Sequence, residues 1–329
     1  VLGVAVLAGF FILLYLPNGG ARGMVTFRIV EGSGVNAISG NLYNAGLLRS
    51  KFVFETYLWL LRGEGRILAG EHQLDPGDNM VILTRKLVTG DAVVNETIVQ
   101  FIEGWTLRDM AEYLDKKNLM PKENFLQLST VTDVRTLLPE ARYAFLDDKP
   151  TEKNLEGYLF PDTYHVFKDP MPADVVKKML DNLEQKLSQE LQEKIRIQGR
   201  TVFEVMTLAS ILEREVQSDV DMRNAADVFL KRIKIGMPLQ SDATVNYITG
   251  KKTTRPTLED LAADSLYNTY KYTGLPPGPI SNPGMTAIRA AIEPTTNDYY
   301  YFITNTAGEA VFARTLEEHQ KNIQQYLNQ

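Results

Sequence analysis

The sequence predicts an α+β protein with an N-terminal membrane helix, a small β-α-α-β module and a larger mixed α/β domain. Three observations support this. Residues 1–16 carry no charge, strand-like and amphipathic helical segments alternate over residues 24–92, and longer helical patterns dominate residues 93–329. A chain of 329 residues is long enough for two domains. Residues 17–23, rich in Gly, are expected to form the linker after the membrane helix.

Composition is that of a folded protein, with 44% hydrophobic and 23% charged residues. The net charge of −6 argues against a nucleic-acid partner, whose binding usually needs a basic face. The chain has no Cys, so it has neither a disulfide framework nor a thiolate nucleophile. His72, His165 and His319 share no ligand spacing. We therefore expect neither a metal site nor a cofactor.

The uncharged segment 1–16 is predicted to be a retained single-pass anchor. A bilayer span needs about 20 apolar residues, and the chain starts at Val1 without Met. The start of the span and a basic flank are therefore expected upstream of Val1. The competing interpretation is the core of a signal peptide. Residues Pro17–Gly23 show no A-x-A cleavage site, which favours the anchor.

The module over residues 24–92 is predicted from five short segments. MVTFRIVEG is strand-like, VNAISGNLYNAGLL and KFVFETYLWLLRG are helical, AGEHQL is a short strand, and NMVILTRKLVTG is a third helix. This order resembles a LysM-type glycan-binding module. An ordinary α/β support domain is the alternative.

The first half of the larger domain begins with a strand, VVNETIVQFIEG. A helix is expected to start at Thr106, because Asp109 three residues later completes a variant of the capping box. Residues 116–155 are polar and loop-rich around short helices, and residues 155–164 suggest a turn with aromatic packing. Residues 172–196 are predicted to form one amphipathic, solvated helix.

A helix over residues 201–217 holds the most informative carboxylates. Its apolar stripe of Val205, Leu208, Ile211 and Leu212 continues onto Glu215. Such a carboxylate lies either in water at the helix end or in a pocket, where desolvation would raise its pKa and make it a general acid. Glu213 lies about 200° around the helix, so the two side chains do not face each other.

The segment after this helix contains the most irregular stretch of the chain. A helix is expected over residues 221–235, and residues 265–284 hold four Pro, three Gly and three Tyr. No helix or strand survives that density of breakers. We interpret it as a rigid loop that lines a groove, because tyrosines suit sugar rings; a structural loop is the alternative. A short helix, a β-hairpin and a last helix complete the chain.

Four blocks together resemble the endolytic murein transglycosylase (MltG, YceG-like) family. They are LEGYLFPDTY (155–164), TLASILEREV (207–216), LQSDATVNY (239–247) and YNTYKYTGLPPGPISNPG (267–284). EEHQKNIQQYL near the C-terminus also fits. The blocks stand in order at matching spacing, so this resemblance is stronger evidence than any single glutamate.

The resemblance implies an inner (cytoplasmic) membrane protein whose catalytic domain is extracytoplasmic. Such a protein cleaves nascent peptidoglycan within the glycan strand and leaves 1,6-anhydro-muramyl ends without metal or cofactor. It implies Glu215 as the catalytic residue and peptidoglycan synthases (penicillin-binding proteins) as partners. For Glu213 we favour a structural role beside the site. The candidates for sugar contacts or for bracing the site are Gln240, Asp242, Tyr267, Asn268 and Tyr270.

Two other functions remain open. A hydrolytic muramidase would need a second carboxylate, for which Asp242 and Glu213 are available. A membrane-anchored scaffold that binds the wall without catalysis is the other. Anhydro product ends would indicate the lyase and reducing ends the hydrolase, whereas a scaffold would tolerate the loss of Glu215.

Overall fold

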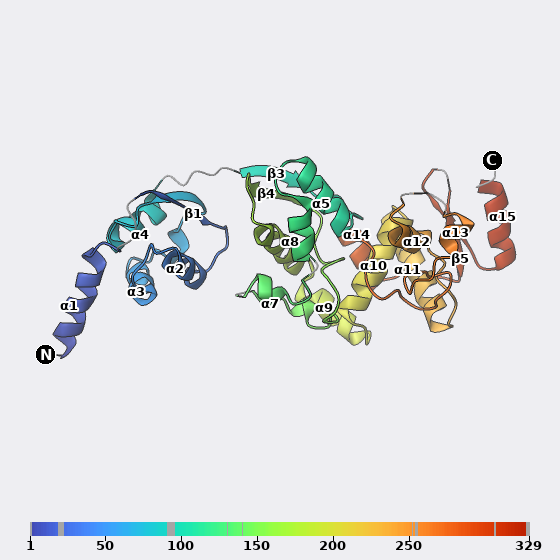
Figure 1. Cartoon of the computed structure of the whole chain (residues 1–329). Coiled ribbons are helices and arrows are strands. Elements are labelled where there is room, and N and C mark those ends of the chain that lie inside the picture. Colours follow the sequence, from blue (N-terminus) through green and yellow to red (C-terminus); the bar gives the residue numbers. More distant parts are fainter. Residues whose placement is uncertain are drawn as a thin grey trace. The chain divides into compact units, whose positions relative to one another are not determined.

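The chain divides into two compact units, Val1–Thr97 and Ile98–Gln329 (Figure 1). Both are mixed α/β, as the sequence predicts, and the described strands form three sheets of two strands each. The computed structural model describes residues 2–18, 23–90, 96–129, 131–139, 141–251, 253, 256–305 and 307–326.

The first helix, α1, covers Leu2–Tyr15. No helix in the described part of the chain is long and apolar enough to cross a membrane. The transmembrane span predicted over residues 1–16 is therefore not found. The C-terminal end of α1 packs against the other helices of the first unit, and its Leu14 is buried in their core.

The rest of the first unit has the predicted β-α-α-β order followed by a third helix. Its two strands pair antiparallel, with Val25 opposite Leu74 and Ile29 opposite Gly70. The elements are β1 (Val25–Ile29), α2 (Val35–Asn44), α3 (Lys51–Leu60), the 3₁₀ turn η1 (Glu64–Arg66), β2 (Gly70–Leu74) and α4 (Met80–Thr89).

This unit has its own hydrophobic core. Leu42, Phe54 and Leu83 are fully buried members, each from a different helix. The side chains of Ser50 and Asn79 cap α3 and α4 by accepting bonds from Val53 and Ile82 backbone N–H groups. Element order and caps thus follow from the sequence, while glycan binding by this module stays a prediction.

The boundary between the two units falls within β3 (Glu96–Gln100), which pairs with β4 of the second unit. Figure 1 shows α5 and α8 beside this sheet. The capping box predicted for Thr106 and Asp109 starts α5, as expected. The sequence did not predict β4, which follows the expected turn. The elements are α5 (Leu107–Lys116), α6 (Lys122–Ser129), α7 (Val134–Leu137), the 3₁₀ turn η2 (Ala144–Leu146) and β4 (Thr163–Phe167).

The single helix predicted over residues 172–196 is wrong, because the structure has two helices there. They are α8 (Pro172–Lys186) and α9 (Gln189–Ile197). Leu187 leaves the helical conformation with ψ 68°, and the Ser188 side chain caps the new helix by accepting from Leu191 N. Serine is a preferred N-cap residue, so Ser188 indicates the start of a new helix. The amphipathic pattern continues across it and suggested a single helix.

The centre of the second unit is α10 (Val202–Glu215). It packs against α11 (Asp219–Lys234) and α14 (Met285–Ile292) in the large hydrophobic core. All three helices were expected, because their apolar positions recur at helical spacing.

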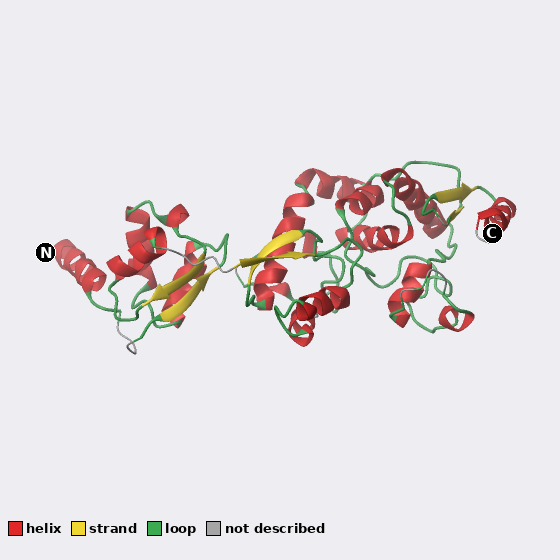
Figure 2. Cartoon of the chain, turned by 90° about the horizontal axis from the view of Figure 1, so that it is seen from above, coloured by secondary structure: helices red, strands yellow, loops and turns green. Residues whose placement is uncertain are grey.

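The remaining elements surround the end of α10. The hairpin is antiparallel, with Tyr301 opposite Ala313, and residues 265–284 form neither helix nor strand, as predicted. Figure 2 shows how much of this region is loop. The sequence did not predict the helix over Asp242–Thr249. The elements are α12 (Asp242–Thr249), α13 (Leu258–Leu261), β5 (Tyr301–Thr304), β6 (Ala310–Ala313) and α15 (Leu316–Tyr326).

Candidate active site

Helix α10 carries Glu215 as its last residue. The helix start is fixed by a capping box between Thr201 and Glu204. The carboxylate of Asp148 also accepts bonds from Val202 N (2.6 Å) and Phe203 N (3.1 Å), which satisfies two free N–H groups of the first turn. A helix that is capped at one end and buried along its length holds its last residue in a fixed place.

Glu215 lines a cavity of about 1060 Å³. The last turn of α10, the facing sides of α11 and α12, strand β5 and helix α15 form its walls. Glu213, Gln240, Asp242 and Tyr270 line the same cavity. The structure therefore brings five of the seven predicted site residues together.

The Glu215 carboxylate is held by the segment that starts α12. The hydroxyl of Ser241 donates a hydrogen bond to its Oε1, and Ala243 N lies 3.4 Å from the same atom. Burial raises the pKa of Glu215, and the charge of Asp242 raises it further. The Ser241 bond favours the carboxylate and opposes this rise of the pKa. Glu215 can therefore stay protonated to higher pH than an ordinary glutamate and still be stabilised as an anion.

Asp242 is the second carboxylate near Glu215. Tyr270 OH donates to its Oδ1 at 2.5 Å. Burial raises the pKa of Tyr270, and the bond to Asp242 raises it further. Tyr270 therefore stays protonated and keeps donating to Asp242 at any ordinary pH.

The irregular loop supports the residues that hold Glu215. Thr269 O accepts from Gln240 N (3.1 Å), and Thr269 Oγ1 accepts from Ser241 N (3.0 Å). Gln240 has φ 54° and is exposed at the cavity. Asn268 is fully buried and lines neither cavity: its Nδ2 donates to Leu261 O (2.9 Å) and Ala263 O (2.8 Å). These bonds tie the loop to the end of α13 and the segment that follows it, so Asn268 stabilises the loop.

Tyr267 lies in a second cavity of about 650 Å³. This cavity shares Arg214, Ala243 and Asn246 with the first, so the two adjoin. The rings of Tyr247 and Tyr267 lie 5.2 Å apart between centroids at its wall. Two tyrosines of the loop therefore line neighbouring cavities, Tyr270 the first and Tyr267 the second.

Glu213 connects α10 to the end of the irregular loop. Gly284 N donates to its Oε2 at 2.9 Å. Burial raises the pKa of Glu213 to about 7, and the nearby charge of Glu103 adds to the rise. The contact fits the bracing role that the sequence suggested, which stays a prediction.

Sequence reasoning did not select Ser241, Arg232 or Glu156. Glu156 is only 6% exposed and accepts from Leu107 N (3.0 Å) and Asn282 Nδ2 (3.0 Å), and burial raises its pKa to about 8. Asn282 Oδ1 in turn accepts from Gly157 N (3.0 Å). Glu156 lies in an apolar stretch, between Leu155 and the YLF sequence that follows Gly157. A lone carboxylate in such a stretch is the pattern that could have predicted its burial.

Within the described residues no group of three or more His, Asp or Glu could hold a metal ion. The chemistry that the arrangement offers is proton transfer by one carboxylic acid in a cavity with polar walls.

Known proteins resemble this chain over most of its length. The endolytic murein transglycosylase of Bacillus subtilis is 34% identical over 310 residues, which cover 92% of this chain and 85% of that protein. The protein of the same name from Streptococcus pneumoniae (strain D39) is 32% identical over 92% of this chain, and the match spans 58% of that longer protein. A crystal structure of a YceG-like protein from Listeria monocytogenes has a TM-score of 0.61 and 32% identity, covering 92% of this chain and 99% of that one.

The match to the family is equally extensive. The model of the YceG-like family matches residues 27–325, which cover most of each unit and every residue of the candidate site. This chain belongs to the YceG-like family.

Proposed function

We propose that the protein is an endolytic lytic transglycosylase of peptidoglycan. It would cleave the β-1,4 bond from N-acetylmuramic acid to N-acetylglucosamine inside a strand. The observation that carries the proposal is Glu215, a half-buried carboxylate with a raised pKa in a polar cavity, in a chain whose relatives are named endolytic murein transglycosylases.

Cleavage of a glycosidic bond needs a proton on the leaving oxygen and a nucleophile at the anomeric carbon. In our scheme Glu215 protonates the leaving oxygen, for which its raised pKa suits it. The resulting carboxylate then takes the proton from the C6 hydroxyl of the muramic residue. That oxygen bonds to C1 of the same sugar and forms the 1,6-anhydro ring, so no water is consumed.

The surroundings of Glu215 fit both of its roles. Before the reaction, burial and the Asp242 charge favour the protonated acid. After proton transfer, the Ser241 hydroxyl and Ala243 N–H face the new carboxylate. Positioned acid–base catalysis of this kind contributes roughly 10²–10⁴-fold to a rate.

An endolytic enzyme must hold a strand that continues on both sides of the broken bond. The two adjoining cavities supply room for sugars on both sides of Arg214 and Asn246. Tyr270 lines one and Tyr267 the other, and tyrosines pack well on the apolar faces of sugar rings. We therefore assign sugar contacts to Tyr267, Tyr270 and the exposed Gln240, with Asp242 bracing Tyr270.

We further propose that the enzyme acts outside the cytoplasmic membrane, near the synthases that make nascent strands. The uncharged segment 1–16 would associate with the membrane, and the β-α-α-β module would bind glycan as the LysM-type modules that it resembles do. Cell fractionation and crosslinking to penicillin-binding proteins test this placement; recovery in the cytoplasm without crosslinks contradicts it.

The test of the reaction is a digest of uncrosslinked peptidoglycan strands in water enriched in heavy oxygen, followed by mass spectrometry. A lytic transglycosylase gives anhydro ends, lighter by one water and free of the heavy isotope. A muramidase gives reducing ends that carry it, which would direct attention to Asp242 as the second carboxylate. Absence of any cleavage of these strands would contradict the proposal and favour a scaffold.

A further inference from the structure

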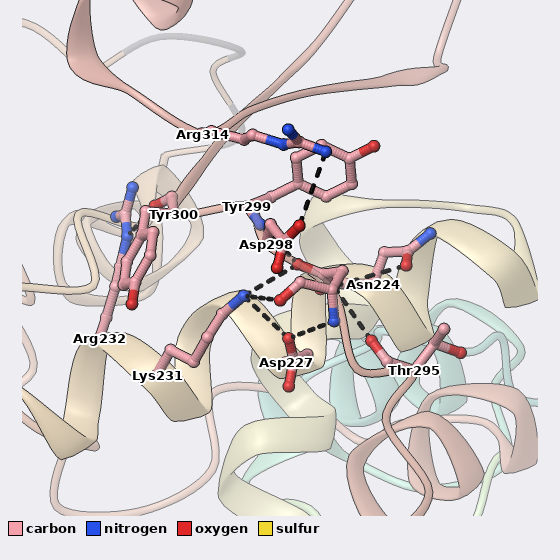
Figure 3. A network of polar contacts seen from close by, with 10 residues as sticks. Asn224, Asp227, Lys231, Arg232, Thr295, Asp298, Tyr299, Tyr300 and Arg314 are labelled. Carbon is pink, nitrogen blue, oxygen red and sulfur yellow. Dashed lines mark hydrogen bonds and ion pairs between the residues drawn. The ribbon is translucent and has the colours of Figure 1, made fainter.

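Arg232 on α11 is a buried cation in the wall of the cavity that holds Glu215. It is only 5% exposed. Its Nε donates to Tyr300 O (2.7 Å) and its Nη1 to Leu239 O (2.7 Å). The guanidinium also lies 5.2 Å from the centre of the Tyr301 ring. Figure 3 shows Arg232 beside Tyr300.

A rigid polar network places the carbonyl that Arg232 uses. Lys231 forms an ion pair with Asp227 (2.9 Å) and donates to Asn297 O (2.7 Å), while Asn297 N donates to Asp227 (3.0 Å) (Figure 3). These bonds fasten the segment before β5 to α11. Arg232 is therefore held in one orientation.

Arg232 lacks the partner that a buried charge normally has. Its neighbours on α11 have one: Lys231 pairs with Asp227, and Arg223 with Asp219 (3.0 Å). Among the described residues no carboxylate forms an ion pair with Arg232. Burial lowers the pKa of Arg232, and the more distant charge of Glu215 opposes this only in part. A buried cation satisfied only by carbonyls is costly unless a ligand supplies the missing charge.

One nitrogen of Arg232 remains available for such a ligand. Nε and Nη1 are used by backbone carbonyls, whereas Nη2 has no hydrogen-bond partner in the described part of the chain. Nη2 is not fully enclosed by protein atoms, and Arg232 lines the cavity. Nη2 is therefore accessible from the cavity.

We propose that Arg232 binds a carboxylate of the muramyl peptide while Glu215 acts on the glycan bond. This rests on the proposed function. The sugar backbone of peptidoglycan is neutral, so its negative charges are carboxylates of the peptide stem or, where the stem has been removed, of the lactyl group. Guanidinium groups match carboxylates in geometry and charge. A cavity of about 1060 Å³ leaves room beyond the sugars for such a substituent.

The ligand carboxylate has two possible sources, and three ligands distinguish them. Strands with intact stems carry stem carboxylates. Strands stripped by an amidase carry only the lactyl carboxylate, and N-acetylglucosamine oligomers of the same length carry none. Binding is measured by calorimetry with the full chain in detergent, in a Glu215→Gln background that prevents turnover.

With Arg232 intact, we expect one carboxylate-bearing ligand to bind about 10- to 100-fold more tightly than the neutral oligomer. Preference for intact strands alone assigns the stem, and preference for stripped strands alone assigns the lactyl group, because the lactyl carboxyl is an uncharged amide in intact strands. Equal preference for intact and stripped strands over the neutral oligomer shows that Arg232 accepts either carboxylate. Equal affinity for all three ligands overturns the inference without touching the proposed function. Absence of binding to any of them contradicts both.

The variant Arg232→Gln, in the same background, should bring the affinity ratio close to one, and Arg232→Lys should recover part of it. The matched control is Arg200→Gln. Arg200 is half-buried and donates to Ala291 O (2.7 Å), but it lines neither cavity, so the ratio should not change. If Arg232→Gln melts with wild-type cooperativity and keeps the ratio, the inference is wrong; if it does not fold, the comparison of ligands with Arg232 intact decides.

Discussion

The hydroxyl of Ser241 donates a hydrogen bond to Oε1 of Glu215. Ser241 lies at the N-cap position of α12, while Glu215 ends α10. The bond therefore joins two helix ends at the cavity. Because it favours the carboxylate form of Glu215, it links the structure of the site directly to the pH range in which a general acid can work.

Ser241→Ala should shift the pH profile of cleavage. Without the hydroxyl, the carboxylate of Glu215 loses a donor, so the pKa of Glu215 should rise above its wild-type value. A general acid loses activity as pH rises through its pKa, so the alkaline limb should move to higher pH. Initial rates of anhydro-end formation across pH test this. A limb that stays in place, or moves down, would refute the assigned role of Ser241.

Glu213→Gln should retain cleavage within about tenfold of wild type, because the amide oxygen can still accept from Gly284 N. Glu213→Ala should lower the free energy of unfolding by about 1–3 kcal/mol, since it leaves that N–H without its partner. Thermal melts and product assays measure the two effects. A complete loss of cleavage with Gln would instead support Glu213 as a second carboxylate of a muramidase.

Glu156 should make the protein less stable as pH rises. Its pKa is about 8 when folded, against an ordinary value of 4.5, so the folded state binds the extra proton between these pH values. Stability is therefore full below about pH 4.5 and falls through about pH 8, at up to about 1.4 kcal/mol per pH unit. Denaturant unfolding of wild type and Glu156→Gln measures this. The Gln variant should lose that slope, and an unchanged slope would refute the assignment.

Gly157→Ala should destabilise the contact between residues 155–164 and the irregular loop over residues 265–284. Gly157 has φ 88°, and an added Cβ would lie 2.5 Å from Pro279 Cβ. Backbone strain and the clash should together cost about 2 kcal/mol or more. Gly274→Ala is the matched control, because Gly274 has φ 86° and nothing within 4 Å of an added Cβ. Equal losses of melting temperature in both variants would show that Pro279 plays no part.

Local patterns predicted most elements of this fold. The apolar stripe of α10 predicted both the helix and the position of Glu215 at its end, and Thr106 with Asp109 predicted the start of α5. The break at Leu187 and Ser188 was missed, because the amphipathic period continues across it.

The parts of the site that depend on distant contacts were less predictable. Ser241 is 26 residues from Glu215 in sequence, and no local pattern links a serine to that carboxylate. Asn268 was predicted to contact sugar or to brace the site, and its amide donates to two backbone carbonyls inside the loop, which fits the second alternative. Arg232 has the sequence context of an ordinary surface helix, and only the fold shows that it is buried against Leu239, Tyr300 and the ring of Tyr301.

The most direct measurement is the rate of anhydro-end formation on uncrosslinked strands by Glu215→Gln, beside wild type and Arg200→Gln. If Glu215 both gives and takes the proton, the Gln variant should lose roughly 10²-fold or more of that rate while melting like wild type. Arg200→Gln should cleave normally. Anhydro ends formed by folded Glu215→Gln at near the wild-type rate would contradict the central claim, because another group would then be the acid.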